Sequence, residues 1–220
     1  MNQLIIIIIL LMLILPIVAA FKIGWGIYVR SKCKLDTKER IVAITFDDGP
    51  DDRNLPKLLD VLDKKGVKST FFFIGEAIAK KPDKLIQTLD EGHNVGIHTY
   101  SHSPFFPFYS LNKIVYEIQE TRMLIKSISK IETSLFRPPF GVTNPNIAYV
   151  IHRLKLTSVG WNIRSFDTIS RSKEKIVRRI MRRLKPGSII LLHSNLDGAA
   201  ELAGLVIDSI RDRGYTIVNL

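Results

Sequence analysis

Two adjacent aspartates directly after an apolar segment are the sequence feature that most constrains the fold of this chain. Residues 41–46 are typical of a buried strand, and Asp47 and Asp48 follow it immediately, before a turn at Gly49 and Pro50. Two carboxylates this close raise one another's pKa unless a cation relieves the repulsion. The fold must therefore place the end of this strand where a cation can reach the pair.

Two histidines supply the other half of such a site. His98 and His102 lie four positions apart and follow a second expected strand, residues 93–97. One carboxylate and two imidazoles are a common ligand set for a hydrolytic metal that keeps one position open. The pattern predicts metal-assisted hydrolysis. The alternatives are an aspartate-capped turn and histidines buried in the core without a metal.

Short apolar runs alternate with helical patterns over the rest of the chain. Expected strands are residues 41–46, 69–74, 93–97, 134–136, 157–161, 188–192 and 216–218, with helices between most of them. Apolar strands that alternate with helices predict a parallel sheet covered by helices, as a barrel or a doubly wound sheet. The expected fold class is α/β, a distorted (β/α) barrel of about seven strands preceded by an N-terminal hydrophobic helix.

Polar residues at the strand ends favour the barrel. In a closed barrel the carboxyl ends of all strands converge on one face, where active sites are built. The residues that follow expected strands are Asp47, Asp48, His98, His102, Arg137, Asp167 and His193. One common site explains their positions.

The first 34 residues differ from the rest. Residues 4–21 carry no charge, and a second apolar run, residues 23–29, follows Lys22. Eighteen or more apolar residues can span a bilayer, so we expect an uncleaved membrane anchor in residues 1–34, with membrane contact through residues 4–29, and a catalytic domain in residues 35–220. A cleaved signal peptide with a small-residue site at 18–20, or a buried soluble helix, are the alternatives.

The net charge of the chain favours some classes of binding partner without selecting one. The formal net charge is +11 at pH 7, and residues 1–34 contribute four basic and no acidic side chains, so the remainder is also basic. Basic charge favours anionic surroundings such as headgroups or acidic wall polymers. We expect no nucleic-acid partner, because no nucleic-acid-binding module accompanies the charge. With Cys33 as the single cysteine, no intrachain disulfide can form.

Four motifs in order resemble those of the polysaccharide deacetylase family, the NodB-homology group or carbohydrate esterase family 4. They are TFDDGP at 45–50, HTYSH at 98–102, RPPFG at 137–141 and LLH at 191–193. The resemblance spans roughly residues 40–220. It implies removal of N-acetyl groups from an amino-sugar polysaccharide such as peptidoglycan, chitin-like polymers or poly-N-acetylglucosamine.

The resemblance also implies a metal and its ligands. Asp48, His98 and His102 would hold a divalent metal, usually zinc, with Co²⁺ or Ni²⁺ possible. The family habit of acting outside the cytoplasmic membrane implies an extracytoplasmic catalytic domain, although the basic flank after residue 21 favours the opposite orientation.

The remaining motif residues take catalytic roles by the same resemblance. Asp47 would be the general base toward water, oriented by Arg137. His193 would be the general acid that protonates the departing amine, with Asp167 holding its ring. The backbone N–H of Phe140 would help to stabilise the oxyanion.

Three departures from the family pattern concern the substrate more than the chemistry. Arg164 and Thr168 stand where family members often carry Asp and Trp, and Phe140 stands where Tyr is frequent. Arg164 could instead meet an anionic group on the substrate. The aromatic segment 104–109 could stack on sugar rings or pack beneath a loop. Hydrolysis of another small amide or an O-acetyl ester, and glycan binding without catalysis, are the alternative functions.

Overall fold

The strands of this chain lie in one parallel sheet. The computed structural model describes residues 3–220, apart from the side chains of residues 4, 6 and 11. Within this part, an eight-stranded sheet has the order β5-β4-β3-β2-β1-β7-β6, and β8 pairs with the start of β1 on the side of β2. The strands are β1 (Ile41–Asp47), β2 (Thr70–Phe73), β3 (Asn94–Ile97), β4 (Leu135–Phe136), β5 (Thr157–Ser158), β6 (Ile163–Arg164), β7 (Ile189–His193) and β8 (Thr216–Val218).

Alternation along β1 divides its side chains between two layers. Val42, Ile44 and Phe46 belong to the hydrophobic core that the helices cover. Because successive side chains on a strand point to opposite faces, Thr45 and Asp47 face the inner side of the curved sheet. Asp47 therefore ends a row of inward-facing residues at the carboxyl end of the central strand.

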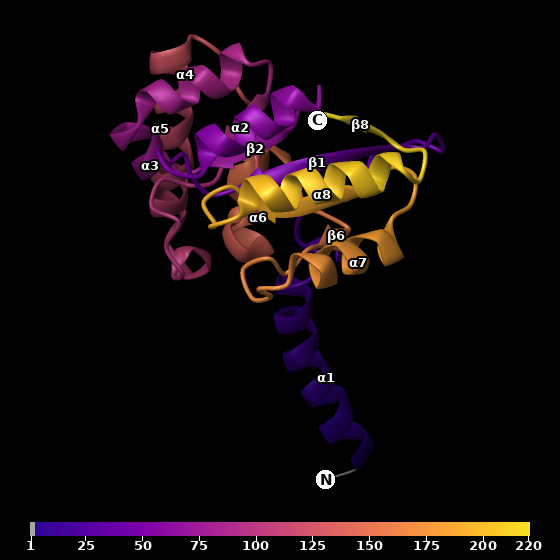
Figure 1. Cartoon of the computed structure of the whole chain (residues 1–220). Helices are drawn as coiled ribbons and strands as arrows, with labels where there is room; N and C mark the ends of the chain where they lie inside the picture. Colours follow the sequence, from indigo (N-terminus) through magenta and orange to yellow (C-terminus); the bar gives the residue numbers. More distant parts are fainter. Residues whose placement is uncertain (1–2) are drawn as a thin grey trace.

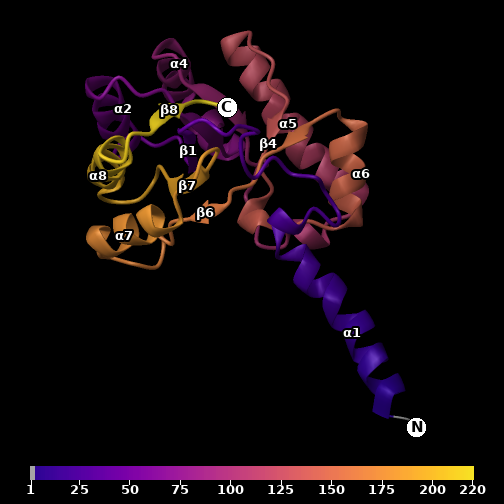
Figure 2. The same cartoon turned by 90° about the vertical axis from the view of Figure 1, so that its right-hand side faces the viewer.

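Helices cover the outer face of the sheet (Figures 1 and 2). On one flank, α8 (Ala199–Arg211) packs between α2 (Leu55–Lys64) and α7 (Lys173–Arg183). On the other, α3 (Gly75–Lys80), α4 (Pro82–Asp90) and α6 (Pro145–Arg153) pack against α5 (Leu111–Ser129). This arrangement leaves the carboxyl ends of the strands open to solvent.

The sheet is a half-barrel, so the expected barrel is only partly correct. The parallel strands agree with the prediction, but no ladder within residues 3–220 joins β5 to β6. Instead, the segment before β1 lies across the gap, because Lys32 forms a bridge with Val159 and Lys34 forms one with Ser188. The two end strands are two residues long, too short to close the sheet by themselves.

The expectation of a membrane-spanning anchor is wrong. The first helix, α1 (Gln3–Ala20), has 18 residues, carries Pro16 and extends away from the domain (Figure 1). Of the helices in the described part of the chain, none is long and apolar enough to cross a membrane. This finding overturns three predictions that we derived from the anchor. They are the single-pass topology, the membrane contact through residues 4–29 and the location in the cell membrane.

The second apolar run does not lengthen the helix, because it folds back onto the domain. After α1 the chain makes a short 3-10 turn (Ile23–Trp25), and Ile23 and Val29 are buried. The N–H of Thr143 donates to the carbonyl of Ala20 at 2.9 Å. Residues 19–34 thus pack against the rest of the fold. The division at residue 35 stays a prediction, and residues 1 and 2 of the expected anchor lie outside the described residues.

Candidate active site

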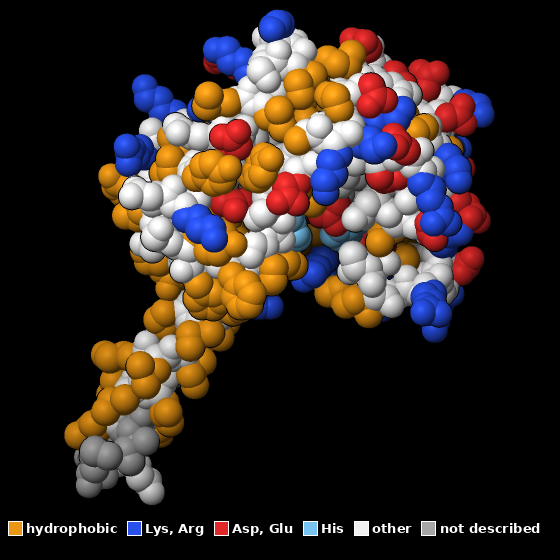
Figure 3. All heavy atoms as spheres, turned by 90° about the vertical axis from the view of Figure 1, so that its left-hand side faces the viewer, with side chains coloured by type: hydrophobic (Ala, Val, Ile, Leu, Met, Phe, Trp, Pro, Cys, Tyr) orange, Lys and Arg blue, Asp and Glu red, His pale blue; other side chains and the backbone are white. Residues whose placement is uncertain are grey.

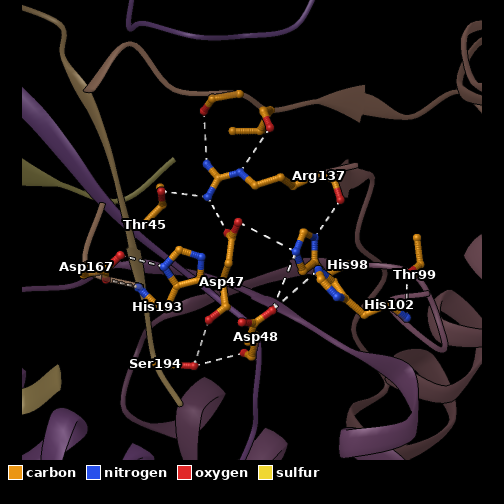
Figure 4. Close-up of polar contacts among 12 residues, drawn as sticks. Thr45, Asp47, Asp48, His98, Thr99, His102, Arg137, Asp167, His193 and Ser194 are labelled. Atoms are coloured by element: carbon orange, nitrogen blue, oxygen red, sulfur yellow. Dashed lines mark hydrogen bonds and ion pairs between the residues drawn. The ribbon is translucent and has the colours of Figure 1, made fainter. Parts of the chain in front are cut away.

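Three possible metal ligands meet at the carboxyl ends of β1 and β3. Asp48 follows β1, and His98 and His102 follow β3 (Figure 4). The Oδ1 atom of Asp48 lies 3.9 Å from His98 Nε2 and 3.7 Å from His102 Nε2. One ligand atom from each residue lies within 4.8 Å of the other two. A cation about 2 Å from each donor requires separations of this size, so the residues fit a divalent metal.

The ring of His98 is oriented by a backbone carbonyl. Its Nδ1–H donates to the carbonyl oxygen of Arg137 at 2.8 Å, and the side chain is buried. A hydrogen bond at one ring nitrogen fixes the tautomer and leaves a lone pair on the other. The Nε2 atom of His98 is consequently directed at the aspartates and free to bind a cation.

The loop that carries His102 is tied to α5 by Glu117. The Oε2 atom of this buried carboxylate accepts hydrogen bonds from the N–H groups of Tyr100 and Ser101 at 3.0 and 2.8 Å, and its Oε1 accepts one from the Ser101 hydroxyl at 2.8 Å. Thr99 Oγ1 accepts from the N–H of His102 at 3.1 Å. Burial, and then the neighbouring His98, lower the pKa of His102, which favours the neutral imidazole that a metal requires.

The backbone separates the two aspartates. Asp48 has a φ of 66°, in the left-handed region, which Asp tolerates better than most residues. The Ser194 hydroxyl donates toward the carbonyls of Asp47 and Asp48 at 3.1 and 3.0 Å and holds this turn against β7. As a result, the Asp48 carboxylate faces the two histidines and the Asp47 carboxylate faces Arg137 (Figure 4).

Arg137 lies wholly inside the half-barrel. Its Nη1 donates to Asp47 Oδ1 at 2.5 Å and to Thr45 Oγ1 at 2.9 Å. Its Nε and Nη2 donate to the carbonyls of Val159 and Gly160 at 3.2 and 3.1 Å. The guanidinium also lies 4.1 Å from the ring centroid of Phe72. Each of the three guanidinium nitrogens therefore has at least one acceptor, as a buried charge requires.

His193 and Asp167 form a second pair at the end of β7. The ring Nδ1–H of His193 donates to Asp167 Oδ1 at 2.8 Å, and its backbone N–H donates to Oδ2 at 2.8 Å. Burial alone would lower the pKa of His193, but Asp167, with Asp47 and Asp48 beyond it, raises the pKa above its ordinary value. The imidazolium form is thereby favoured on this side of the site.

Aromatic residues border the metal ligands on the opposite side. Phe140 has a φ of 60° and is half exposed, with its ring 5.0 Å from that of His102. Within the aromatic segment 104–109, Phe106 is buried whereas Phe105 and Phe108 are exposed. Phe108 and Phe140 both line a hollow of about 720 Å³. The segment was expected either to stack on sugar rings or to pack beneath a loop. Phe106 packs in the interior, whereas the exposed rings of Phe105 and Phe108 remain candidates for contact with a sugar.

All eight site residues expected from the sequence lie at this end of the sheet. Six of them, Asp47, Asp48, His98, His102, Arg137 and His193, are linked by the contacts above or by direct strand pairing, and Asp167 joins through His193. Phe140 contacts His102 by its ring.

The sequence did not predict three residues that orient the site, Glu117, Thr45 and Ser194. Glu117 lies on the apolar face of α5, beside Ile114 and Ile118, so an acidic residue at a core position was the signal available. Thr45 opens the first motif and Ser194 follows the last, but neither carried such a signal, because Thr and Ser are common in any strand or turn.

Fold and site together define an α/β protein with a candidate metal site at the carboxyl ends of parallel strands. Residues 34–159 match the family model described as polysaccharide deacetylase. The chain is 32% identical over 186 residues to the peptidoglycan-N-acetylmuramic acid deacetylase PdaC of Bacillus subtilis, and this match covers 84% of the chain but 39% of that protein. It is 31% identical over 196 residues to a peptidoglycan-N-acetylglucosamine deacetylase of Bacillus cereus, covering 85% of the chain and 89% of the relative.

A solved structure agrees in fold. The structure of the peptidoglycan deacetylase PdaC from Bacillus subtilis superposes with a TM-score of 0.77 at 32% identity, covering 84% of this chain and 90% of that one. The chain belongs to the polysaccharide deacetylase family, and the resemblance seen in the motifs is confirmed. The match to this chain covers well under half the length of the whole PdaC protein.

Replacing Glu117 tests the part that α5 plays in the metal centre. We expect Glu117→Gln to weaken zinc binding by about 10- to 100-fold, as loss of groups behind metal ligands typically does, because the loop from Tyr100 to His102 loses its charged acceptor. Zinc affinity is measured by competition with a chromophoric chelator. Glu120→Gln, an exposed change on the same helix, is the control and should bind zinc normally. Equal affinities for the two variants would show that Glu117 does not orient the ligands.

Proposed function

We propose that this chain is a metal-dependent deacetylase that removes N-acetyl groups from amino sugars of peptidoglycan. The printed names of the relatives support the substrate class, since they describe deacetylation of N-acetylmuramic acid or N-acetylglucosamine in peptidoglycan. The observation that carries the proposal is the position of Asp47 and His193. They are paired residues on the neighbouring strands β1 and β7, directly beside the three possible metal ligands.

Asp48, His98 and His102 would hold the metal, which we propose is zinc. Two imidazoles and one carboxylate suit zinc in a catalytic site, with Co²⁺ and Ni²⁺ as alternatives that accept similar donors. Bound there, the cation would polarise the acetyl carbonyl and lower the pKa of water to about 7.

Asp47 is the proposed general base. Its Oδ1 is engaged by Arg137, whereas its Oδ2 lies 3.7 Å from His98 Nε2 and makes no hydrogen bond within the described residues. The Oδ2 atom therefore borders the ligand cluster with a lone pair available for a proton from water. Arg137 would keep the carboxylate turned in this direction.

His193 is the proposed general acid. Cleavage of an amide needs a proton on the departing nitrogen, and an imidazolium can donate it near neutral pH. Asp167 orients the ring through Nδ1, so the proton to be donated sits on Nε2. The N–H of Phe140 would donate to the oxyanion, and residues 35–220 would form the catalytic unit.

Replacing Asp47 separates catalysis from metal binding. We expect Asp47→Asn to lower acetate release from N-acetylated peptidoglycan strands by at least about 100-fold, because the base is lost, while zinc stays bound. His98→Ala should lose both, and chelation of the wild type should remove activity until zinc is restored. Acetate is measured by an enzyme-coupled assay and zinc by elemental analysis.

Asp52→Asn, an exposed change in the same loop, should leave acetate release at the wild-type rate. If Asp47→Asn releases acetate nearly as fast as the wild type, Asp47 is not the base. If no N-acetylated glycan yields acetate with the zinc-loaded wild type, another small amide, an O-acetyl ester or binding without catalysis takes the place of this proposal.

The Asp167–His193 pair predicts the pH dependence. An acid must be protonated to act, so kcat/KM should fall as pH rises through the pKa of His193. The charge of Asp167 raises this pKa, so Asp167→Asn should move the alkaline limb to lower pH by on the order of one unit. The exposed change Asp197→Asn serves as the control. An unshifted alkaline limb in Asp167→Asn would mean that His193 is not the acid that the profile reports.

A further inference from the structure

Two arginines lie against one aromatic ring close to the proposed acid. The guanidinium of Arg164, at the end of β6, lies 5.0 Å from the ring centroid of Phe166, and that of Arg179, on α7, lies 4.1 Å from it. Planar guanidinium groups stack readily on aromatic faces. Phe166 thus gathers two cations from different elements at one place.

The pair is held by the backbone as well as by the ring. Arg179 Nε donates to the carbonyl of Arg164 at 3.0 Å. Phe166 has a φ of 61°, which turns the chain sharply between Arg164 and Asp167. Both arginines are partly buried, so their orientations are restrained before any ligand arrives, which reduces the entropy that binding costs.

Neither cation is neutralised. Among residues 3–220, Arg164 and Arg179 form no ion pair with a carboxylate. Desolvation, followed by the charges of Arg183, Arg182 and Arg164, lowers the pKa of Arg179. Like charges gathered without a counter-ion are unfavourable, and an anion bound to them would relieve the repulsion.

The pair adjoins the catalytic machinery. Residue 167, directly after Phe166, bonds to His193 through both carboxylate oxygens. In the register of β6 and β7, Arg164 pairs with Leu191, two residues before His193. In the space-filling view, Lys and Arg side chains lie along the edge of the hollow that exposes the histidines (Figure 3). Arg164 therefore lies on the strand next to the one that carries the proposed acid.

We propose that Arg164 and Arg179 bind a carboxylate of the substrate, so that the chain selects amino sugars bearing an acidic substituent over neutral ones. This inference rests on the proposed function and specifies its substrate. A guanidinium fork matches a carboxylate with two parallel hydrogen bonds, which gives direction as well as affinity. The carboxylate can belong to the sugar itself or to a peptide attached to it, and the chemistry of recognition is the same.

The test compares one glycan with and without its acid groups. Peptidoglycan strands freed of stem peptides are used with the sugar carboxylates intact, or after carbodiimide activation and borohydride reduction to the alcohol. For the wild type we expect kcat/KM to be at least about tenfold higher on the intact strands. Strands that retain their peptides form a third arm, and a preference confined to them would assign the carboxylate to the peptide.

Variants separate recognition from packing. Arg164→Gln and Arg179→Gln should each raise KM on the intact strands by about tenfold or more, with kcat and the activity on reduced strands unchanged. Arg164→Lys, which keeps the charge without the fork, should recover part of the loss. Arg178→Gln, an exposed change on α7, is the control and should behave as wild type.

Two results would overturn the inference. The first is equal activity of the wild type on intact and reduced strands. The second is that the Arg164 and Arg179 variants lose the same share of activity on both kinds of strand, which is the result expected of a purely structural role. Calorimetric binding of the strands to Asp47→Asn separates this failure from failure of the proposed function. Carboxylate-dependent binding that Arg164→Gln abolishes supports the inference even if no acetate is released.

Discussion

The ion pair between Arg137 and Asp47 is the interaction on which the rest of the site depends. A cation and an anion buried together cost several kcal/mol in desolvation, which close contact and further hydrogen bonds must offset. Here Thr45, two backbone carbonyls and the ring of Phe72 complete the surroundings of the guanidinium. Gly96 makes room for that ring, since a side-chain carbon at this position would come within 2.6 Å of it.

The same arginine links the two halves of the site. Its side chain engages Asp47 on β1, and its carbonyl accepts the Nδ1–H of His98 after β3. One aspartate is thereby held away from the metal position, while a histidine is turned toward it. The repulsion between neighbouring carboxylates is resolved by giving each its own partner, Arg137 for Asp47 and the two imidazoles for Asp48.

Much of the fold and of the candidate site could be predicted from the sequence, because these features depend on local sequence patterns. Apolar strands ending in polar residues predicted both the parallel sheet and the convergence of Asp47, His98 and His193. The N-terminal segment could not be read in this way, since its burial depends on partners more than 100 residues away, such as Thr143 and Ser158. The open barrel likewise follows from two end strands too short to close the sheet, and Glu117 acts through a loop that no periodicity describes.

Diffraction from crystals of the zinc-loaded protein, with anomalous data at the zinc edge, tests the central claim most directly. The account predicts one zinc ion about 2.0–2.2 Å from Asp48, His98 and His102, with Asp47 still paired with Arg137. An ion ligated by Asp47, with the Arg137 pair broken, would contradict the division of the two aspartates into ligand and base.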